Sequence, residues 1–113
     1  MKNVKRPKKD DTMKTQETTF IEIFGHNPAM KVLDFLITYQ LFDYPLTEIA
    51  KNAGVSYSTL QSFWHNLERN NLVIKTRRVG KSDLYKLNTQ NPAVKQLIKL
   101  DWNLVKGTEE VYA

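Results

Sequence analysis

The chain has 113 residues, no cysteine, only two histidines and a formal charge of +5 at neutral pH. This length predicts a single domain with tails, and the lack of cysteine excludes disulfides and thiolate metal sites. No apolar run approaches the roughly 20 residues of a membrane span, and the basic N-terminus lacks the apolar core of a secretory signal. We therefore expect a cytoplasmic protein that has no membrane, metal or cofactor partner.

Residues 1–17 are polar, with six Lys or Arg against three acidic residues, and we expect a disordered basic arm. Such an arm either follows a DNA minor groove or only raises solubility. The next segment, 18–25 (TTFIEIFG), fits one face of a short helix and, more weakly, the alternation of a strand. We favour a helix that ends at Gly25.

Asn27 and Pro28 predict the start of the first long helix, because asparagine caps helices well and proline suits the first helical position. An apolar face continues to about Gln40. The segment 42–45 then interrupts the pattern, and Thr47 is expected to cap the next helix, which ends near Ala53.

The segment 47–63 (TEIAKNAGVSYSTLQSF) predicts two helices joined by a tight turn. Gly54 suits the left-handed backbone of that turn, and Ser56 is expected to cap the second helix. This helix, about 57–70, carries an apolar stripe at i, i+3, i+4 and i+7. The stripe consists of Leu60, Phe63, Trp64 and Leu67.

Residues 73–79 are β-branched and basic, and a turn-rich segment at 80–83 separates them from residues 84–87. This arrangement predicts a β-hairpin. Side chains alternate between the two faces of a regular strand. The expected faces are Lys75, Arg77 and Val79 on one side, and Ile74, Thr76 and Arg78 on the other.

Asn91 and Pro92 repeat the cap-and-proline pattern and predict a last helix at about 92–106, ended by Gly107 and followed by a tail at 108–113. Its apolar residues cover roughly 200°, wider than the stripe of about 100° expected for a helix buried on one side. We therefore expect a homodimer. The alternative is that residues 18–25 cover this surface within one chain. The expected interface residues are Leu97, Leu100, Trp102 and Leu104.

Three motifs carry a resemblance to a known family: NPAMKVLDFLI, LTEIAKNAGVSYSTLQSFWHNLERNNLV and IKTRRVGKSDLYKL. Over about 27–87 the chain resembles prokaryotic, especially archaeal, winged helix-turn-helix transcription regulators of the MarR/ArsR-like type. The resemblance implies a mainly α fold with a small β-hairpin, in which residues 18–107 form a three-helix core, a wing and a C-terminal helix. The chain lacks the cysteine ligands of metal-sensing relatives, so metal sensing is not expected.

The resemblance also implies that helix 57–70 enters the major groove of double-stranded DNA and that wing 73–87 contacts the backbone or the minor groove. Gln61 suits an adenine edge, and the serines near the helix start suit phosphate oxygens. The alternative is a solvated helix face with Ser56 only as a cap, and wing charges that protect an edge strand. The candidate DNA contacts are Ser56, Tyr57, Ser58, Gln61, Ser62, His65, Arg69, Arg77, Arg78 and Lys81.

No glycine-rich phosphate loop, catalytic carboxylate pair or nucleophile motif is present, so we do not expect an enzyme. The sequence instead predicts a sequence-specific, dimeric, DNA-binding transcription regulator. Two alternatives stay open, namely a winged-helix module that binds protein within a larger assembly, and RNA binding.

Overall fold

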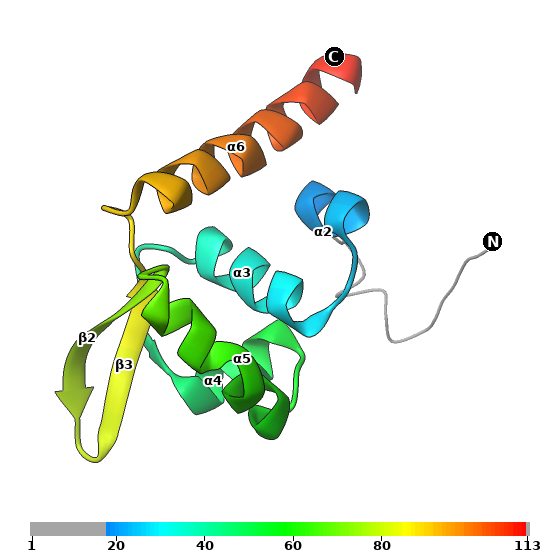
Figure 1. The fold of residues 1–113 in the computed structure, drawn as a ribbon. Helices are drawn as coiled ribbons and strands as arrows, with labels where there is room; N and C mark the ends of the chain where they lie inside the picture. The colour runs from blue at the N-terminus through cyan, green and yellow to red at the C-terminus, as the bar shows by residue number, and fades with distance from the viewer. Residues whose placement is uncertain (1–17, 113) are drawn as a thin grey trace.

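A computed structural model describes the backbone of residues 18–112 and the side chains of residues 18–106 (Figure 1). The arm predicted at 1–17 lies outside the described residues. The fold is mainly helical with a small antiparallel sheet, as predicted. Its elements are α2 (Thr19–Phe24), α3 (Pro28–Thr38), β1 (Tyr44–Pro45), α4 (Leu46–Ala53), α5 (Tyr57–Arg69), β2 (Val73–Val79), β3 (Ser82–Leu87) and α6 (Pro92–Tyr112).

The hydrophobic core lies between α3, α4 and α5, with the base of the hairpin on one side and α2 and α6 on the other (Figure 1). The apolar stripes predicted for the helices supply it, although Phe63 is only partly buried. Removing these side chains from water is the main force that holds the helices together. The most deeply buried side chains are Phe20, Val32, Leu36, Ile49, Leu60, Leu87 and Val94.

Side-chain caps begin four of the described helices, and in α6 the Asn91 side chain accepts from the backbone amide of Ala93. Thr18, Asn27 and Ser56 each accept a hydrogen bond from the backbone amide three residues later. The prediction that Thr47 caps α4 is wrong, because the chain passes from β1 directly into α4 and Leu46 is already helical. Pro45 occupies the cap position and provides no side-chain hydrogen bond.

The turn between α4 and α5 is built around Gly54, which has a φ of 76° in the left-handed region. Glycine adopts this conformation without the clash that a side chain would cause. The amide of Val55 then donates to the carbonyl of Ala50 at 3.0 Å and closes the turn. The predicted helix-turn-helix is thereby confirmed in its local geometry.

The three strands lie in the order β1-β3-β2, and both strand pairs are antiparallel. The hairpin is confirmed, but β3 begins at Ser82, so its turn is only Gly80 and Lys81. The predicted faces of β2 are wrong, because the register shifts between Lys75 and Arg77. A β-bulge of this kind adds one residue to a strand and reverses the alternation beyond it.

The last helix, α6, begins at Pro92 as predicted but continues to Tyr112, so the predicted end at Gly107 is wrong. Glycine inside a helix costs only about 1 kcal/mol relative to alanine, so a single glycine does not have to end a helix. Within residues 18–112, no helix is long and apolar enough to cross a membrane.

Candidate nucleic-acid interface

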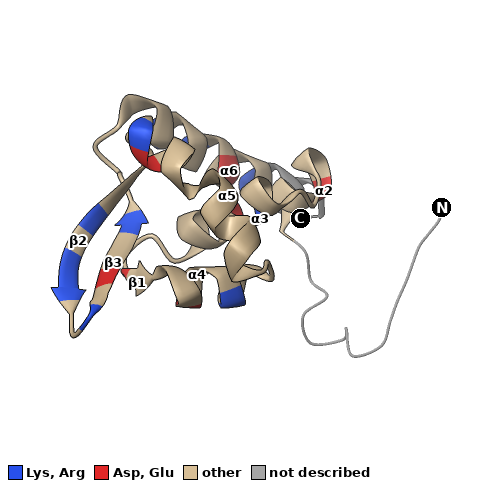
Figure 2. Ribbon diagram, turned by 60° about the horizontal axis from the view of Figure 1, so that its bottom comes forward, with Lys and Arg blue, Asp and Glu red and all other residues tan. Residues whose placement is uncertain are grey.

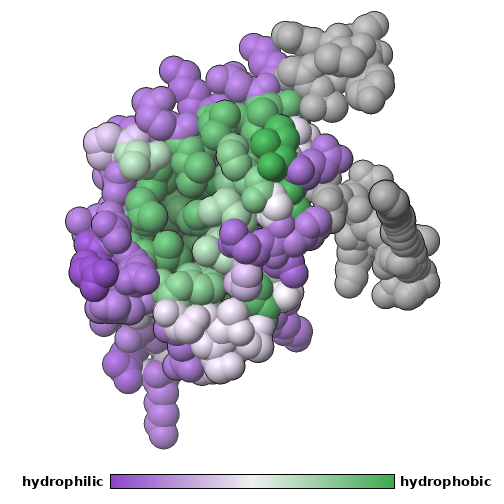
Figure 3. Space-filling model, turned by 45° about the vertical axis from the view of Figure 1, so that its right-hand side comes forward, coloured by the Kyte–Doolittle hydropathy of each residue, from purple (hydrophilic) through white to green (hydrophobic). Residues whose placement is uncertain are grey.

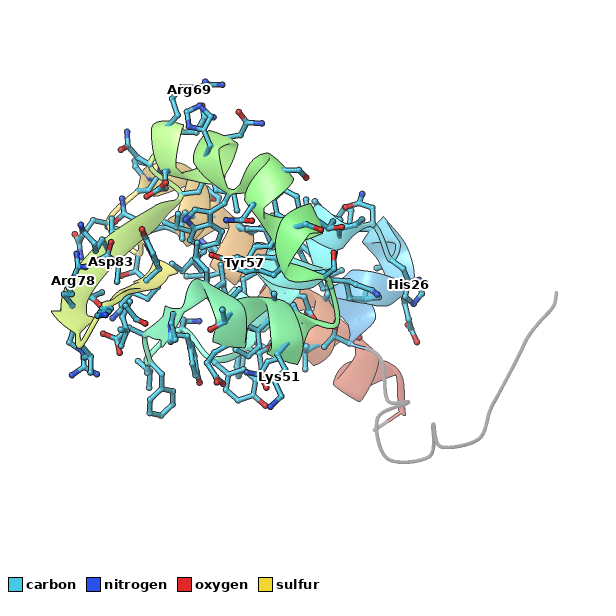
Figure 4. The ribbon with its side chains drawn as sticks, turned by 90° about the horizontal axis from the view of Figure 1, so that it is seen from below. His26, Lys51, Tyr57, Arg69, Arg78 and Asp83 are labelled. Carbon is cyan, nitrogen blue, oxygen red and sulfur yellow. The ribbon has the colours of Figure 1, made fainter. Side chains whose placement is uncertain are left out.

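The flank of α5 opposite its buried stripe is polar and exposed. Tyr57, Ser58, Gln61, Ser62, His65 and Arg69 all lie on this solvent side. Tyr57 is 44% exposed at the start of the helix, and Arg69 lies at the other end (Figure 4). Tyr57 and Gln61 form no hydrogen bond to another described side chain, so their polar groups are available to a partner.

Several other polar side chains of α5 already have partners within the helix. The hydroxyl of Ser56 donates to Thr59 Oγ1 at 2.8 Å and accepts from the Thr59 amide at 3.1 Å. Ser62 donates to the carbonyl of Thr59. Arg69 contacts His65 Nε2 at 3.0 Å and donates to Asn66 Oδ1 at 2.9 Å. Because a guanidinium only donates, Nε2 accepts, and the proton of a neutral His65 lies on Nδ1.

A shallow groove of about 220 Å³ separates the start of α5 from the hairpin. The start of α4 forms its floor, and Tyr57 and Lys81 both line it. Lys81 lies in the two-residue hairpin turn and has no ion pair among the described residues. The groove therefore brings a lysine of the hairpin tip beside the first turn of the exposed helix.

The hairpin face that contacts α5 carries Lys75 and Arg78. Lys75 is opposite Tyr85, and Arg78 is opposite Asp83. Tyr85 packs edge-on against Trp64 of α5, with ring centroids 5.2 Å apart. Both cations pair with Asp83, at 3.6 Å and 3.5 Å, and Figure 4 shows Arg78 and Asp83 together on the hairpin.

Arg77 lies on the opposite face of the hairpin from Arg78, opposite Leu84. Its guanidinium forms two hydrogen bonds with Asp43, from Nε to Oδ2 at 2.9 Å and from Nη2 to Oδ1 at 3.1 Å. The hydroxyl of Thr76 also donates to Asp43 Oδ2. These hydrogen bonds, from Arg77 first and then Thr76, lower the pKa of Asp43 to about 2. The structure thus separates two arginines that the sequence placed in one candidate site.

Asp43 and Lys75 belong to this region although the sequence did not predict them there. Asp43 precedes Arg77 by 34 residues, and a single sequence contains no signal that joins two such distant positions. Lys75 was expected on the same strand face as Arg77 and was not among the candidate DNA contacts. Its place beside Asp83 follows from the bulge, which no local pattern predicted.

Positive charge on this side of the molecule lies on the hairpin rather than on α5 (Figure 2). The segment 56–70 contains one arginine and one glutamate, whereas 73–87 contains five Lys or Arg and one aspartate. The described residues contain no cluster of three or more histidine, aspartate or glutamate side chains arranged to hold a metal ion.

A second surface of a different kind lies between α2, α3 and α6. Figure 3 shows hydrophobic side chains gathered into one broad, hollowed face on this side of the molecule. Its hollow measures about 430 Å³ and is lined by Ile37, Ile98, Val105 and Trp102 among others. Trp102 is 64% exposed and Leu100 is 39% exposed, whereas Leu97 and Leu104 are half-buried.

Two carboxylates belong to this apolar region. Asp101 lines the hollow, and burial raises its pKa. Burial also raises the pKa of Asp34, and the negative charge of Asp101 adds to the effect. The hydroxyl of Thr18 opposes it by donating to Asp34 Oδ1 at 2.8 Å. Among the side chains of residues 18–106, neither carboxylate forms an ion pair with a cation.

α2 covers only part of this surface. Phe20 and Ile21 are buried against the core, but Ile23 and Phe24 are 56% and 44% exposed. Residues 18–25 therefore cover only part of the wide apolar face of α6 within one chain. Apolar side chains of both helices stay exposed to solvent.

No protein-family model matches the chain, and neither does any curated protein. The solved structures that share its fold include the following three. The antimony-specific transcriptional repressor AntR is 18% identical, with a TM-score of 0.56 over 74% of this chain and 72% of AntR. A mutant of S. aureus MepR is 19% identical, with a TM-score of 0.57 over 91% of this chain and 75% of MepR. A mutant of Lactococcus lactis ZitR in its apo form is 16% identical, with a TM-score of 0.55 over 91% of this chain and 74% of ZitR. These similarities show that the chain has the winged helix-turn-helix fold.

Proposed function

We propose that this protein is a sequence-specific, dimeric regulator of transcription that binds double-stranded DNA. α5 acts as the recognition helix in the major groove, and the hairpin acts as the wing on the backbone or in the minor groove. The observation that carries the proposal is the exposed polar flank of α5 beside a cationic wing, with Tyr57 and Lys81 lining one groove. The AntR repressor, which shares the fold, supports the regulatory role.

The roles of individual residues follow from their surroundings. Gln61 is exposed at the middle of the first two turns of α5 and presents the amide that suits an adenine edge. Tyr57, Ser58 and Lys81 are placed to contact phosphates on either side of it. Lys75 and Arg78 lie on the hairpin face that contacts α5, and each forms an ion pair with Asp83. Ser56, Ser62, His65 and Arg69 remain candidates whose internal hydrogen bonds compete with DNA.

The apolar face of α2 and α6 supports a homodimer. Exposed Ile23, Phe24, Leu100 and Trp102 gather on these two helices, and an apolar surface of this kind marks an interface. A two-fold dimer places one recognition helix on each half-site, about one helical turn apart. The proposed interface includes Leu97, Leu100, Trp102 and Leu104.

Selection of binding sites from random duplex DNA tests this function. We expect the purified protein to enrich one pseudo-palindromic sequence. Enrichment of no sequence, or equal retention of single-stranded RNA, would remove the proposal.

Gln61→Ala tests the base-reading role within the same experiment. We expect it to relax the preference at one position in each half-site, by about tenfold, because a bidentate contact discriminates by roughly 1–3 kcal/mol. Asn66→Ala is the matched control, since Asn66 is an exposed amide that already accepts from Arg69. If Gln61→Ala selects the wild-type sequence unchanged, the base-reading assignment is wrong.

A further inference from the structure

The wing is held from both of its faces near the middle of its length. On one face, Tyr85 of β3 packs against Trp64 of the recognition helix. On the other face, Asp43 binds Thr76 and Arg77 of β2. A two-stranded hairpin has little stability of its own, so these two attachments, together with the pairing of β1 with β3, determine where its free end lies.

The second attachment crosses the sheet. Asp43 immediately precedes β1, which pairs with β3, and β2 lies on the other edge of the sheet. The carboxylate therefore reaches over the middle strand to the far one. Only 17% of the Asp43 side chain is exposed, although 63% of Arg77 is. The contact joins the loop after α3 to the outer strand of the wing.

The β-bulge makes this contact possible. Consecutive side chains of a regular strand point to opposite faces, and Thr76 and Arg77 are consecutive. The register shift at this point lets both reach one carboxylate. It also turns Arg78 to the other face, where Arg78 joins Lys75 beside Asp83. The bulge thus places Thr76 beside Arg77 on one face of the wing and Lys75 beside Arg78 on the other.

We propose that Asp43 is a positioning residue for DNA binding: with Arg77 and Thr76 it forms a clamp that fixes the wing tip, residues 78–83, relative to the recognition helix. Arg77 serves this clamp and does not contact DNA. This inference rests on the proposed function, since a fixed tip matters when Lys81 and the recognition helix must meet the same duplex. The pKa of Asp43, about 2, keeps its carboxylate charged at every ordinary pH.

The clamp and a purely electrostatic role predict opposite signs for one variant. Asp43→Asn removes a negative charge near a polyanion, so charge alone predicts tighter DNA binding. Loss of the clamp predicts weaker binding to the selected duplex, by about threefold, a size typical of exposed bidentate pairs. Arg77→Gln changes the charge the other way but breaks the same clamp, so we expect a similar loss.

The experiment is a double-mutant cycle on the selected duplex, with Asp43→Asn, Arg77→Gln and the double variant. If the two residues act as one unit, the double variant binds no more weakly than either single variant. Glu22→Gln is the matched control, because it makes the same charge change on α2, far from the wing (Figure 1). Because α2 belongs to the proposed dimer interface, sedimentation checks that this variant stays a dimer, and we then expect it to bind like the wild type. Tighter binding by Asp43→Asn together with weaker binding by Arg77→Gln would overturn the inference and make Arg77 a phosphate contact.

Amide hydrogen exchange of the free protein tests, without DNA, whether the clamp stabilises the wing tip. We expect Asp43→Asn and Arg77→Gln to speed exchange of the amides in residues 76–83 several-fold and to leave α3 and α5 unchanged. Unchanged exchange in both variants would overturn the clamp. Wild-type protein that prefers no duplex would instead remove the proposed function and with it the positioning role, while the exchange result would still decide whether the clamp exists.

Discussion

The wing and the apolar face of α2 and α6 treat their carboxylates in opposite ways. At the wing, Asp83 of the hairpin and Asp43 of the loop before β1 pair with arginine and lysine side chains. The pKa of Asp43 is lowered to about 2. On the apolar face, burial raises the pKa of Asp34 and of Asp101. The wing is thus built to keep charge ordered in water, whereas the apolar face carries charge at a cost.

This difference shows which surface suits which partner. A charged, water-exposed ribbon, whose tip lysine has no ion pair among the described residues, can exchange water for phosphates. A hollowed apolar face with two carboxylates that burial disfavours is suited to a partner that excludes water, and a second copy of the chain is the partner that we propose. Substitutions on each surface should therefore affect different properties, namely DNA binding for the wing and dimerisation for the apolar face.

The largest effect is expected from Trp102→Glu on the apolar face. A new charge at the proposed interface should give a monomer by sedimentation and weaken binding to a two-half-site duplex on the order of 100-fold, because avidity is lost. The fold should persist, since Trp102 is 64% exposed, and circular dichroism checks this. Leu41→Glu is the matched control, because it adds the same charge at a leucine that is 82% exposed and lies outside α2 and α6. A dimeric Trp102→Glu protein with normal affinity would place the interface elsewhere.

A smaller effect is expected from Lys81→Ala at the wing tip. Loss of one phosphate contact should weaken binding several-fold and reduce the slope of log affinity against log salt by about 0.9. Mobility shifts at several salt concentrations measure both quantities. Lys95→Ala on α6 removes the same charge from an exposed site away from the wing and should leave the slope unchanged. Equal slopes for all three proteins would remove Lys81 from the interface.

The smallest effect is expected on the thermal unfolding midpoint of Asp101→Asn and Asp43→Asn. This pair of variants compares the two surfaces most directly. The pKa of Asp101 is raised by folding, so its ionisation opposes folding as pH rises through and above 3.8. Asp101→Asn should therefore raise the unfolding midpoint near pH 7, on the order of 2 °C. The gain should vanish as acid protonates the wild-type carboxyl.

Asp43→Asn should have the opposite sign. The folded pKa of Asp43 is lowered to about 2, so its ionised form stabilises the fold above 3.8, and this contribution is lost as pH falls from 3.8 toward 2. The variant should unfold at a lower temperature near pH 7 and match the wild type in strong acid. If both variants shift the midpoint in the same direction, the contrast between the two surfaces is wrong.

Local signals in the sequence predicted the helices and the turn between α4 and α5, because caps and glycines act on neighbouring residues. Asn27, Gly54 and Ser56 behave as their positions imply. The predictions from Thr47 and Gly107 were wrong. The chain enters α4 directly from β1, so Thr47 is not its cap, and α6 continues through Gly107 to Tyr112.

The candidate site was harder to predict than the fold. Exposure of Tyr57, Gln61 and Lys81 followed from the helical stripe and the hairpin turn. The sequence did not predict which side chains share each face of the wing. That arrangement depends on a one-residue bulge and on contacts between Asp43 and a strand 34 residues away. Such contacts are fixed by tertiary packing and have no local signature.

Footprinting of the wild-type protein on its selected duplex decides whether it is a dimeric, sequence-specific DNA-binding protein. We expect two protected half-sites related by two-fold symmetry and centred about 10 base pairs apart, with protection that fades as salt rises. A footprint on a single half-site, or protection that does not depend on sequence, would contradict it.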